Sequence, residues 1–144
     1  MGIRVKSLPN AAGVFKKRSA AAYRDHKRRA ARYGYTLPYT LAELREYVRE
    51  RLDGHPGCRY CGVLLTDADF CLDHVRSVGR VVDARTWTLS NLNVACKTCN
   101  EIKGRLHGGE FKDLMAVVNT LSPQAQADIR GRLRAGAARC AGKR

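Results

Sequence analysis

Residues 96–104, CKTCNEIKG, and the earlier stretch 58–61, CRYC, decide how the middle of the chain folds. Each stretch contains two cysteines separated by two residues, a spacing that lets one tight turn direct both thiols at the same ion. Four thiolates complete a tetrahedral zinc shell and leave no coordination position open, so such an ion is structural. The predicted zinc ligands are Cys58, Cys61, Cys96 and Cys99.

Three polar residues near these cysteines are candidates for chemistry. Asp73 and His74 lie between the two pairs, and Asn100 directly follows Cys99. An imidazole has an ordinary pKa near 6.5 and can accept a proton from water, so we expect His74 to be a general base. Oxygen ligands are preferred by Mg2+ and Mn2+, so we expect Asp73 and Asn100 to bind a catalytic divalent cation. The side chains of neighbouring strand residues point to opposite faces, so Asp73 and His74 can both enter one site only if the strand ends or is distorted there. We therefore expect such an irregularity at His74.

The length of 144 residues fits one α+β domain built from short elements. An alanine-rich basic run without Gly or Pro predicts the first helix, and a capping box at Thr40 predicts the second. We expect Gly108 and Gly109 to stop the helical stretch that follows the second cysteine pair. The expected elements are helices 16–32 and 41–52, strands 70–75 and 92–95, a loop 76–91, a helical stretch 96–105, and two helices that begin near Phe111 and Ser122.

Positive charge is concentrated outside the cysteine-rich region. The formal net charge is +14, and residues 1–52 contribute +9 of it, from 13 Lys/Arg against 4 Asp/Glu. A basic surface around a nearly neutral site is typical of a protein that binds a polyanion, and nucleic acid is the leading candidate partner. The basic segments lack a broad apolar face and no long apolar run occurs, so no membrane association is expected.

Several basic residues are candidate nucleic-acid contacts. In the first helix they recur at spacings of three or four with few acidic residues to pair with, which favours contact with phosphates. Lys103 lies one helical turn beyond Asn100, which favours a phosphate contact at the site. His26, in the first helix, is expected to lie at the surface. The full set of expected contacts is Arg24, Lys27, Arg28, Arg32, Arg76, Lys97 and Lys103.

A resemblance to a known family rests on the order of these motifs. The two cysteine pairs, Asp73-His74, Asn91 and the stretch 96–104 resemble the HNH endonuclease superfamily over about residues 56–106. His74, Asn91 and Asn100 match the three letters of the motif, which makes the chain an HNN variant. The resemblance implies a ββα-metal (His-Me finger) core. It also implies that Asn91 serves the catalytic site by orienting the loop and His74.

These expectations define three segments. They are a basic helical extension (1–54), a nuclease core with zinc knuckles (55–108) and a helical segment with a basic tail (109–144). The expected function is hydrolysis of DNA phosphodiester bonds with one catalytic Mg2+ or Mn2+ and no small-molecule cofactor. The four paired cysteines and the lack of a charged-then-apolar leader indicate an intracellular, reducing compartment. The resemblance implies that this compartment is the cytoplasm of a bacterial or phage-infected cell.

Two alternatives account for the charge and the cysteines equally well. One is a non-catalytic zinc-stapled protein that binds nucleic acid through its basic helices. The other is a zinc-stapled protein that docks to a protein partner or an RNA particle. Neither explains why Asn100 directly follows Cys99 in a chain that also contains Asp73-His74.

Overall fold

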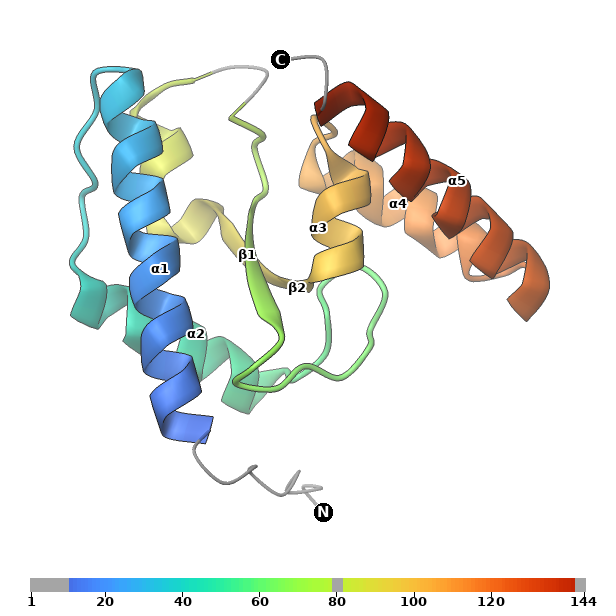
Figure 1. Ribbon diagram of the computed structural model, residues 1–144, viewed down its shortest axis with the longest axis horizontal. Helices are drawn as coiled ribbons and strands as arrows, with labels where there is room; N and C mark the ends of the chain where they lie inside the picture. Colours follow the sequence, from blue (N-terminus) through green and yellow to red (C-terminus); the bar gives the residue numbers. More distant parts are fainter. Residues whose placement is uncertain (1–10, 79–81, 142–144) are drawn as a thin grey trace.

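The computed structural model describes residues 11–78 and 82–141, in which five α-helices surround a two-stranded antiparallel sheet (Figure 1). The helices and strands are α1 (Ala11–Arg32), α2 (Leu41–Gly54), β1 (Phe70–His74), β2 (Leu92–Cys96), α3 (Lys97–Lys103), α4 (Gly108–Val118) and α5 (Pro123–Ala141). Two short 3-10 helices, η1 (Ala84–Trp87) and η2 (Leu89–Asn91), precede β2. The expected α+β class is therefore confirmed. Within the described ranges, none of the helices has the length and apolar character needed to cross a bilayer.

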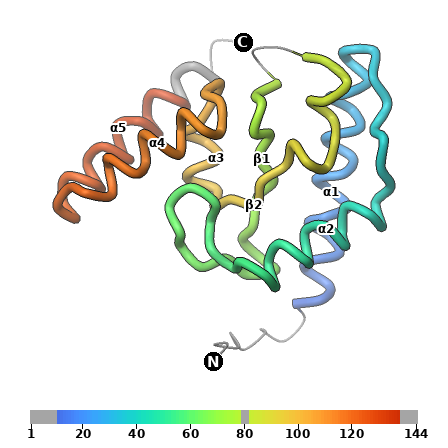
Figure 2. Tube along the Cα trace, turned by 180° about the vertical axis from the view of Figure 1, so that it is seen from behind, coloured from blue at the N-terminus to red at the C-terminus, as the bar shows by residue number. Residues whose placement is uncertain are grey.

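The sheet and α3 lie between two pairs of helices. Figures 1 and 2 show α1 and α2 on one side of this central unit, and α4 and α5 on the other. One buried apolar cluster connects the parts: Phe15 from α1, Leu44 from α2, Phe70 from β1, and Phe111 and Met115 from α4 belong to it. The same core therefore supports the cysteine-rich unit and the helices that flank it.

Helix α1 presents one face to the rest of the protein. Its buried residues are Phe15, Ser19, His26 and Ala30, whose spacings of four and seven place them along one stripe. The helix starts five residues earlier than predicted, at Ala11, and ends after Arg32. Gly34 follows with a positive φ of 79°, which suits glycine. The surface position expected for His26 is wrong, because its side chain is on the buried stripe.

Helix α2 begins with the predicted capping box. The Thr40 side chain accepts a hydrogen bond from the Glu43 backbone N–H, and the Glu43 carboxylate accepts one from the Thr40 backbone N–H. Leu44, Val48 and Leu52 are buried along one side of the helix. The helix ends two residues after Leu52, close to the predicted position.

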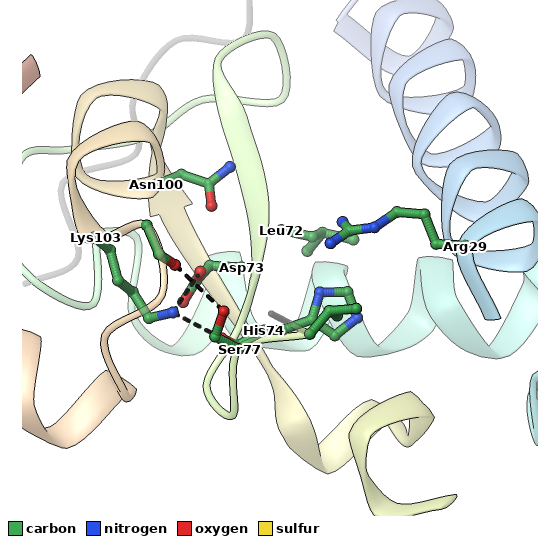
Figure 3. Close-up of a pocket in the computed structure, with 9 residues that line it drawn as sticks. Arg29, Leu72, Asp73, His74, Ser77, Asn100 and Lys103 are labelled. Atoms are coloured by element: carbon green, nitrogen blue, oxygen red, sulfur yellow. Dashed lines mark hydrogen bonds and ion pairs between the residues drawn. The ribbon is translucent and has the colours of Figure 1, made fainter. Parts of the chain in front are cut away.

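The two strands pair in regular register through the functional motif. Asp73 lies opposite Asn93 and His74 lies opposite Leu92, which is the last pair of the ladder. The predicted irregularity at His74 is therefore not a distortion. The strand ends there after regular pairing, so Asp73 and His74 keep the alternation of a strand and point to opposite sides of it (Figure 3).

The glycines after α3 have different roles from those predicted. Gly104, with a φ of 54°, directly follows α3, whereas Gly108 begins α4, so the prediction that Gly108 and Gly109 stop a helix is wrong. A Cβ atom on Gly108 would lie 2.9 Å from Cγ1 of Val75, so this position requires glycine for close packing. Helix α4 begins three residues before the predicted start near Phe111, and Phe111, Met115 and Val118 are among its buried residues.

Candidate active site and zinc centre

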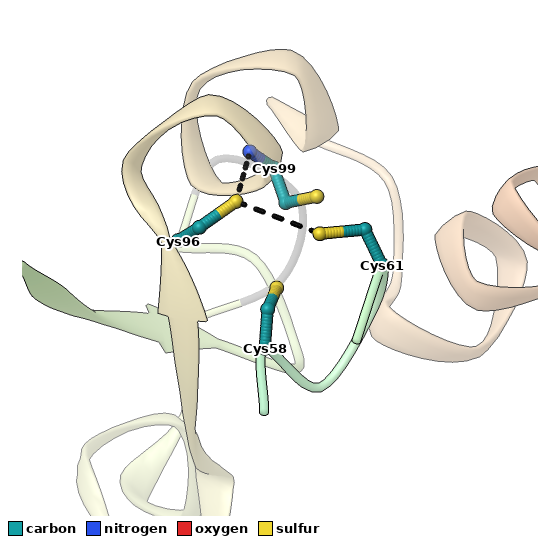
Figure 4. A group of neighbouring side chains, drawn as sticks. All are labelled: Cys58, Cys61, Cys96 and Cys99. Atoms are coloured by element: carbon teal, nitrogen blue, oxygen red, sulfur yellow. Dashed lines mark hydrogen bonds between the residues drawn. The ribbon is translucent and has the colours of Figure 1, made fainter. Parts of the chain in front are cut away.

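Two tight turns bring the four paired cysteines together (Figure 4). In the first turn, Gly62 has a φ of 76°, and its backbone N–H donates to the Cys58 carbonyl at 2.9 Å. In the second turn, Cys96 is the N-cap of α3, and its sulfur accepts a hydrogen bond from the Cys99 backbone N–H. Each cysteine pair is therefore fixed by backbone hydrogen bonds that close its turn.

The geometry of the cluster fits a structural zinc ion. All four sulfur atoms lie within 4.8 Å of one another, and the Sγ atoms of Cys61 and Cys96 are 3.8 Å apart. A tetrahedron with Zn–S bonds of about 2.3 Å has sulfur–sulfur edges of about 3.8 Å. Hydrogen bonding to Cys61 lowers the pKa of Cys58, whereas hydrogen bonding to Cys58 raises the pKa of Cys99. The crowded thiols therefore cannot all ionise unless a cation compensates their charge.

Two further cysteines, Cys71 and Cys140, are not part of the predicted zinc shell. Cys71 lies on β1 outside the cluster, half-buried, and its sulfur is 3.8 Å from an Arg18 nitrogen. The side chain of Cys140 lies outside the part of the chain that is described. Among the described residues, the four-cysteine cluster is the group with metal-binding geometry among His, Cys, Asp and Glu side chains.

His74 and the two predicted cation ligands line one pocket of about 190 Å³, whereas Asn91 is not among its lining residues. Asp73 and His74 contribute from β1, Asn100 and Lys103 from α3, and Arg29 from α1 (Figure 3). The structure therefore brings together the three residues predicted to act as base and cation ligands. They reach the pocket from elements that the zinc knuckles and the main core hold in place.

Asp73 is buried and has a partner on each carboxylate oxygen. Its Oδ1 is 3.1 Å from the ammonium of Lys103, and its Oδ2 accepts a hydrogen bond from the Tyr60 hydroxyl. Burial raises the pKa of Asp73, while the charge of Lys103 opposes this rise. Tyr60 lies between Cys58 and Cys61, and Lys103 belongs to the helix that begins at the second knuckle. Both partners of Asp73 thus come from elements that the zinc centre fixes.

The ring of His74 is held by aromatic contacts. Its centroid is 4.8 Å from the ring of His26 and 5.7 Å from the ring of Trp87. Within the described residues, neither ring nitrogen of His74 has a hydrogen-bond partner. Burial, followed by the charge of His26, lowers the pKa of His74 to about 3, so the ring is neutral at neutral pH.

Asn91 fixes the loop that follows His74. Its side-chain oxygen accepts from the Arg76 backbone N–H at 2.9 Å, and its side-chain nitrogen donates to the Thr86 carbonyl at 2.9 Å. Its own backbone carbonyl accepts from the Val75 N–H at 2.8 Å. These bonds fix the backbone conformation of the chain just beyond His74.

The oxygen atoms at and beside Asp73 are of the type that a small, hard cation prefers as ligands. Asp73 offers a carboxylate, and the Asn100 amide reaches from α3 into the same pocket (Figure 3). The ammonium of Lys103 is the competing cation, because it already neutralises Asp73. It also donates to the His74 carbonyl at 2.9 Å. A divalent ion at Asp73 would have to displace this ammonium or share the carboxylate with it.

The predicted nucleic-acid contacts fall into two groups. The four on α1, which are Arg24, Lys27, Arg28 and Arg32, are exposed on the face opposite the buried stripe. Lys97 is also exposed, with a loose pair to Glu101. By contrast, Arg76 forms an ion pair with Asp83 at 3.0 Å, and the Lys103 side chain is 1% exposed. Only the exposed group is able to contact a duplex without rearrangement.

Sequence reasoning missed three residues at the pocket. His26 packs on His74, Arg29 lines the pocket, and Tyr60 hydrogen bonds to Asp73. One signal was present for His26: it continues the stripe of Phe15 and Ser19 at helical spacing, which predicts a buried position. Nothing local marked Arg29 among its basic neighbours, or Tyr60 as a partner of Asp73.

The strand–strand–helix unit and the adjoining polar pocket define a ββα domain, and its four clustered thiols could hold one zinc ion. Residues 58–106 match the family model described as HNH endonuclease, and this region contains both cysteine pairs and all three motif letters. The similarity is thus to an HNH endonuclease domain over these residues, and it points to nuclease or nucleic-acid-binding activity. Comparison with curated proteins and with solved structures gave no match.

Proposed function

We propose that the protein is an HNH-type endonuclease that hydrolyses phosphodiester bonds of DNA in a bacterial or phage-infected cell. In this proposal His74 is the general base, and Asp73 and Asn100 hold one divalent cation. The observation that supports it most is that these three residues line one pocket beside a four-cysteine zinc centre. All three belong to the segment that matches the HNH family.

His74 would take a proton from the attacking water. Its ring is neutral at neutral pH and both of its nitrogens are without hydrogen-bond partners among the described residues, so one can face a water molecule. A base with a pKa of about 3 accepts a proton weakly. A phosphate bound in the pocket would raise that pKa, because a nearby negative charge stabilises the imidazolium.

The Asp73 carboxylate and the Asn100 amide oxygen would hold Mg2+ or Mn2+. When bound, the cation supplies Lewis-acid stabilisation of the phosphate and of the departing 3′ oxygen. Asp73 is fixed for this task by Tyr60, while Asn91 holds the loop after His74. Lys103 keeps positive charge beside the phosphate position whether or not it remains paired with Asp73.

Helix α1 would bind the DNA backbone. Arg29 lines the pocket, and its half-buried guanidinium makes only a loose pair with Asp25 at 3.8 Å. The four exposed basic residues named above add positive charge on the outer face of the same helix. Contacts of this kind neutralise phosphates without reading bases, so the proposal includes no preferred sequence.

A non-catalytic zinc-stapled nucleic-acid-binding protein is the alternative. The observation that favours it is the buried pair of Lys103 and Asp73, because the carboxylate needed for a cation is already neutralised. In that case the pocket would be a structural feature and the basic helix would carry the whole function.

Cleavage of supercoiled plasmid separates the two functions. We expect the parent protein to nick the plasmid with Mg2+ or Mn2+ and not with EDTA, and His74→Ala to abolish nicking while binding DNA as the parent does. His55→Ala is the matched control, because His55 is an exposed histidine outside the pocket. Equal binding by all three proteins with no metal-dependent nicking by the parent would favour the non-catalytic function.

A further inference from the structure

Within the described part of the chain, His74 lacks the hydrogen bond that usually orients a catalytic histidine. In many enzymes, one ring nitrogen bonds to a carboxylate or a carbonyl, which sets the tautomer and the plane of the ring. Among the described residues, no group bonds either nitrogen of His74. The backbone of β1 fixes where the side chain starts but leaves the ring free to rotate. Its plane must therefore be set by the rings that pack against it.

The closest of these rings belongs to His26 of helix α1. Its centroid is 4.8 Å from that of His74, with an interplanar angle of 59°, and its side chain is buried. Trp87 packs at 5.7 Å with an angle of 77°, nearly edge-on. His74 thus lies against two rings that come from segments far apart in the chain.

His26 is itself held in place by a polar bond. Its Nδ1 lies 3.1 Å from the hydroxyl of the buried Tyr39. Burial raises the pKa of Tyr39, so the phenol keeps its proton, and it has no other acceptor among the described residues. Tyr39 therefore donates to Nδ1, and the proton of the neutral His26 ring resides on Nε2. Burial also lowers the pKa of His26 to about 4, so it packs on His74 without charge.

An apolar residue would fill this position at lower cost if packing were the only requirement. Burying an imidazole requires a partner for its polar atoms, and here Tyr39 supplies one. The bond fixes the ring plane of His26, which a leucine or methionine could not match. The same helix face, one turn later, brings Arg29 to the pocket.

We propose that His26 is a positioning residue that, with Tyr39 behind it, sets the ring orientation of His74 for proton transfer. Helix α1, which lies outside the segment that matches the HNH family, is then part of the active site rather than only a grip on DNA. This inference rests on the proposed function of His74 as the base. Whether His26 fixes the orientation of the His74 ring can be measured independently of cleavage.

The test compares His26→Ala, His26→Gln and Tyr39→Phe with the parent protein. We expect His26→Ala to lower the single-turnover cleavage rate about 10- to 100-fold, since small misplacements of a reacting group have effects of this size. DNA affinity should change less than about twofold, because His26 does not face solvent. His26→Gln can still bond to Tyr39 and should recover part of the rate, and Tyr39→Phe should show an intermediate loss.

Ser19→Ala provides the matched control for stability. Ser19 is buried on the same face of α1 but bonds to Arg45 and to its own helix, away from the pocket. If substitutions in α1 reduced cleavage only by destabilising the fold, Ser19→Ala and His26→Ala variants of equal melting temperature would lose equal activity. Retention of activity by the Ser19 variant alone assigns the effect to the site.

A nuclear magnetic resonance measurement reports on the ring directly. In the parent, nuclear Overhauser contacts between His74 and Trp87 ring protons should be strong, and in His26→Ala they should fall several-fold while amide signals elsewhere stay unchanged. Unchanged contacts together with an unchanged rate would overturn the inference. If the parent does not cleave DNA, the proposed function fails, whereas the ring contacts still decide whether His26 holds His74.

Discussion

Lys103 and Asp73 form a buried ion pair at the centre of the candidate active site. The Lys103 ammonium lies 3.1 Å from Oδ1 of Asp73, and the two side chains are 1% and 6% exposed. A buried charge without a partner is strongly destabilising, so this pair accounts for an ionised carboxylate on a side chain that is almost fully buried. It also means that a divalent cation and an ammonium compete for the same oxygen.

Lys103→Gln should strengthen divalent-cation binding. Removing a positive charge a few ångströms from the cation should raise Mn2+ affinity by about tenfold or more, even after strong screening. The metal-free variant should be less stable by on the order of 3 kcal/mol, because Asp73 is left without its counter-charge. Mn2+ titration followed by electron paramagnetic resonance measures the first effect, and urea unfolding measures the second.

The matched control for this pair is Lys97→Gln. Lys97 is on the same helix, but its side chain is 72% exposed and its pair with Glu101 is 3.8 Å long. Its replacement should leave both quantities close to the parent values. Equal Mn2+ affinity in the parent and the Lys103 variant would show that the cation does not bind at Asp73.

Cys96→Ser should disrupt both the zinc centre and the pocket. Cys96 is a zinc ligand and the N-cap of α3, and α3 carries Asn100 and Lys103, so loss of the ion releases the helix that supplies half of the pocket. Zinc content per chain should fall to near zero, with loss of the cooperative unfolding transition. Cys71→Ser is the control and should keep its zinc, because Cys71 lies outside the cluster. Full zinc occupancy in the Cys96 variant would refute the four-cysteine ligand set.

Neutralising the exposed face of α1 should weaken DNA binding uniformly across sequences. The residues to change to glutamine are Arg24, Lys27, Arg28 and Arg32. Each phosphate contact that is removed should reduce the slope of log affinity against log salt concentration by about 0.9, so removing four contacts gives a reduction of about 3 to 4. Neutralising Lys112 and Arg132, exposed on α4 and α5, should change the slope little. A slope equal to that of the parent in the α1 variant would move the DNA-binding surface elsewhere.

Stability should decrease at acidic pH because two histidines are buried neutral. Burial lowers the pKa of His26 to about 4 and that of His74 to about 3, from an ordinary value near 6.5. Between these limits the unfolded chain binds protons that the folded protein does not, so the free energy of unfolding falls as the pH falls below about 6.5. For His26 alone the loss between about pH 7 and pH 4.5 is on the order of 2 kcal/mol.

Protonation of the zinc-binding thiolates also lowers the free energy of unfolding as the pH falls, so measurements on the parent alone do not separate the contribution of the histidines. The variant His26→Gln separates it, because this change removes one buried titrating ring and leaves the zinc ligands intact. Urea unfolding across this pH range should give a shallower pH dependence for the variant than for the parent. Parallel curves would mean that the pKa of His26 is the same in the folded and unfolded states.

The zinc centre and the strand that carries Asp73 and His74 were predictable because their signals are local. Cysteine spacing fixes the two turns, and the apolar residues around Asp73 fix a strand. The contacts that define the pocket are not local. Lys103 reaches Asp73 from the helix after the second knuckle, and His26 reaches His74 from α1. No spacing rule in the sequence indicates which basic residue or which histidine makes such a contact.

The error about His74 has a related cause. A distortion of the strand was expected because one site seemed to require both side chains on one face. The structure instead keeps the strand regular and surrounds it: α3 approaches the side of Asp73 and α1 approaches the side of His74 (Figure 3). Because a helix packs on each side of the strand, both side chains can line one pocket without a distortion. The sequence pattern of the core does not indicate how these flanking helices pack.

The most direct test of the central claim is single-turnover cleavage of a labelled DNA duplex in 18O-enriched water with Mg2+, for the parent and His74→Ala. We expect the parent to leave a 3′ hydroxyl and a 5′ phosphate that contains one solvent-derived oxygen. The account predicts that His74→Ala cuts at least about 100-fold more slowly while binding the duplex equally well. Cleavage by the variant at the parental rate would contradict the account.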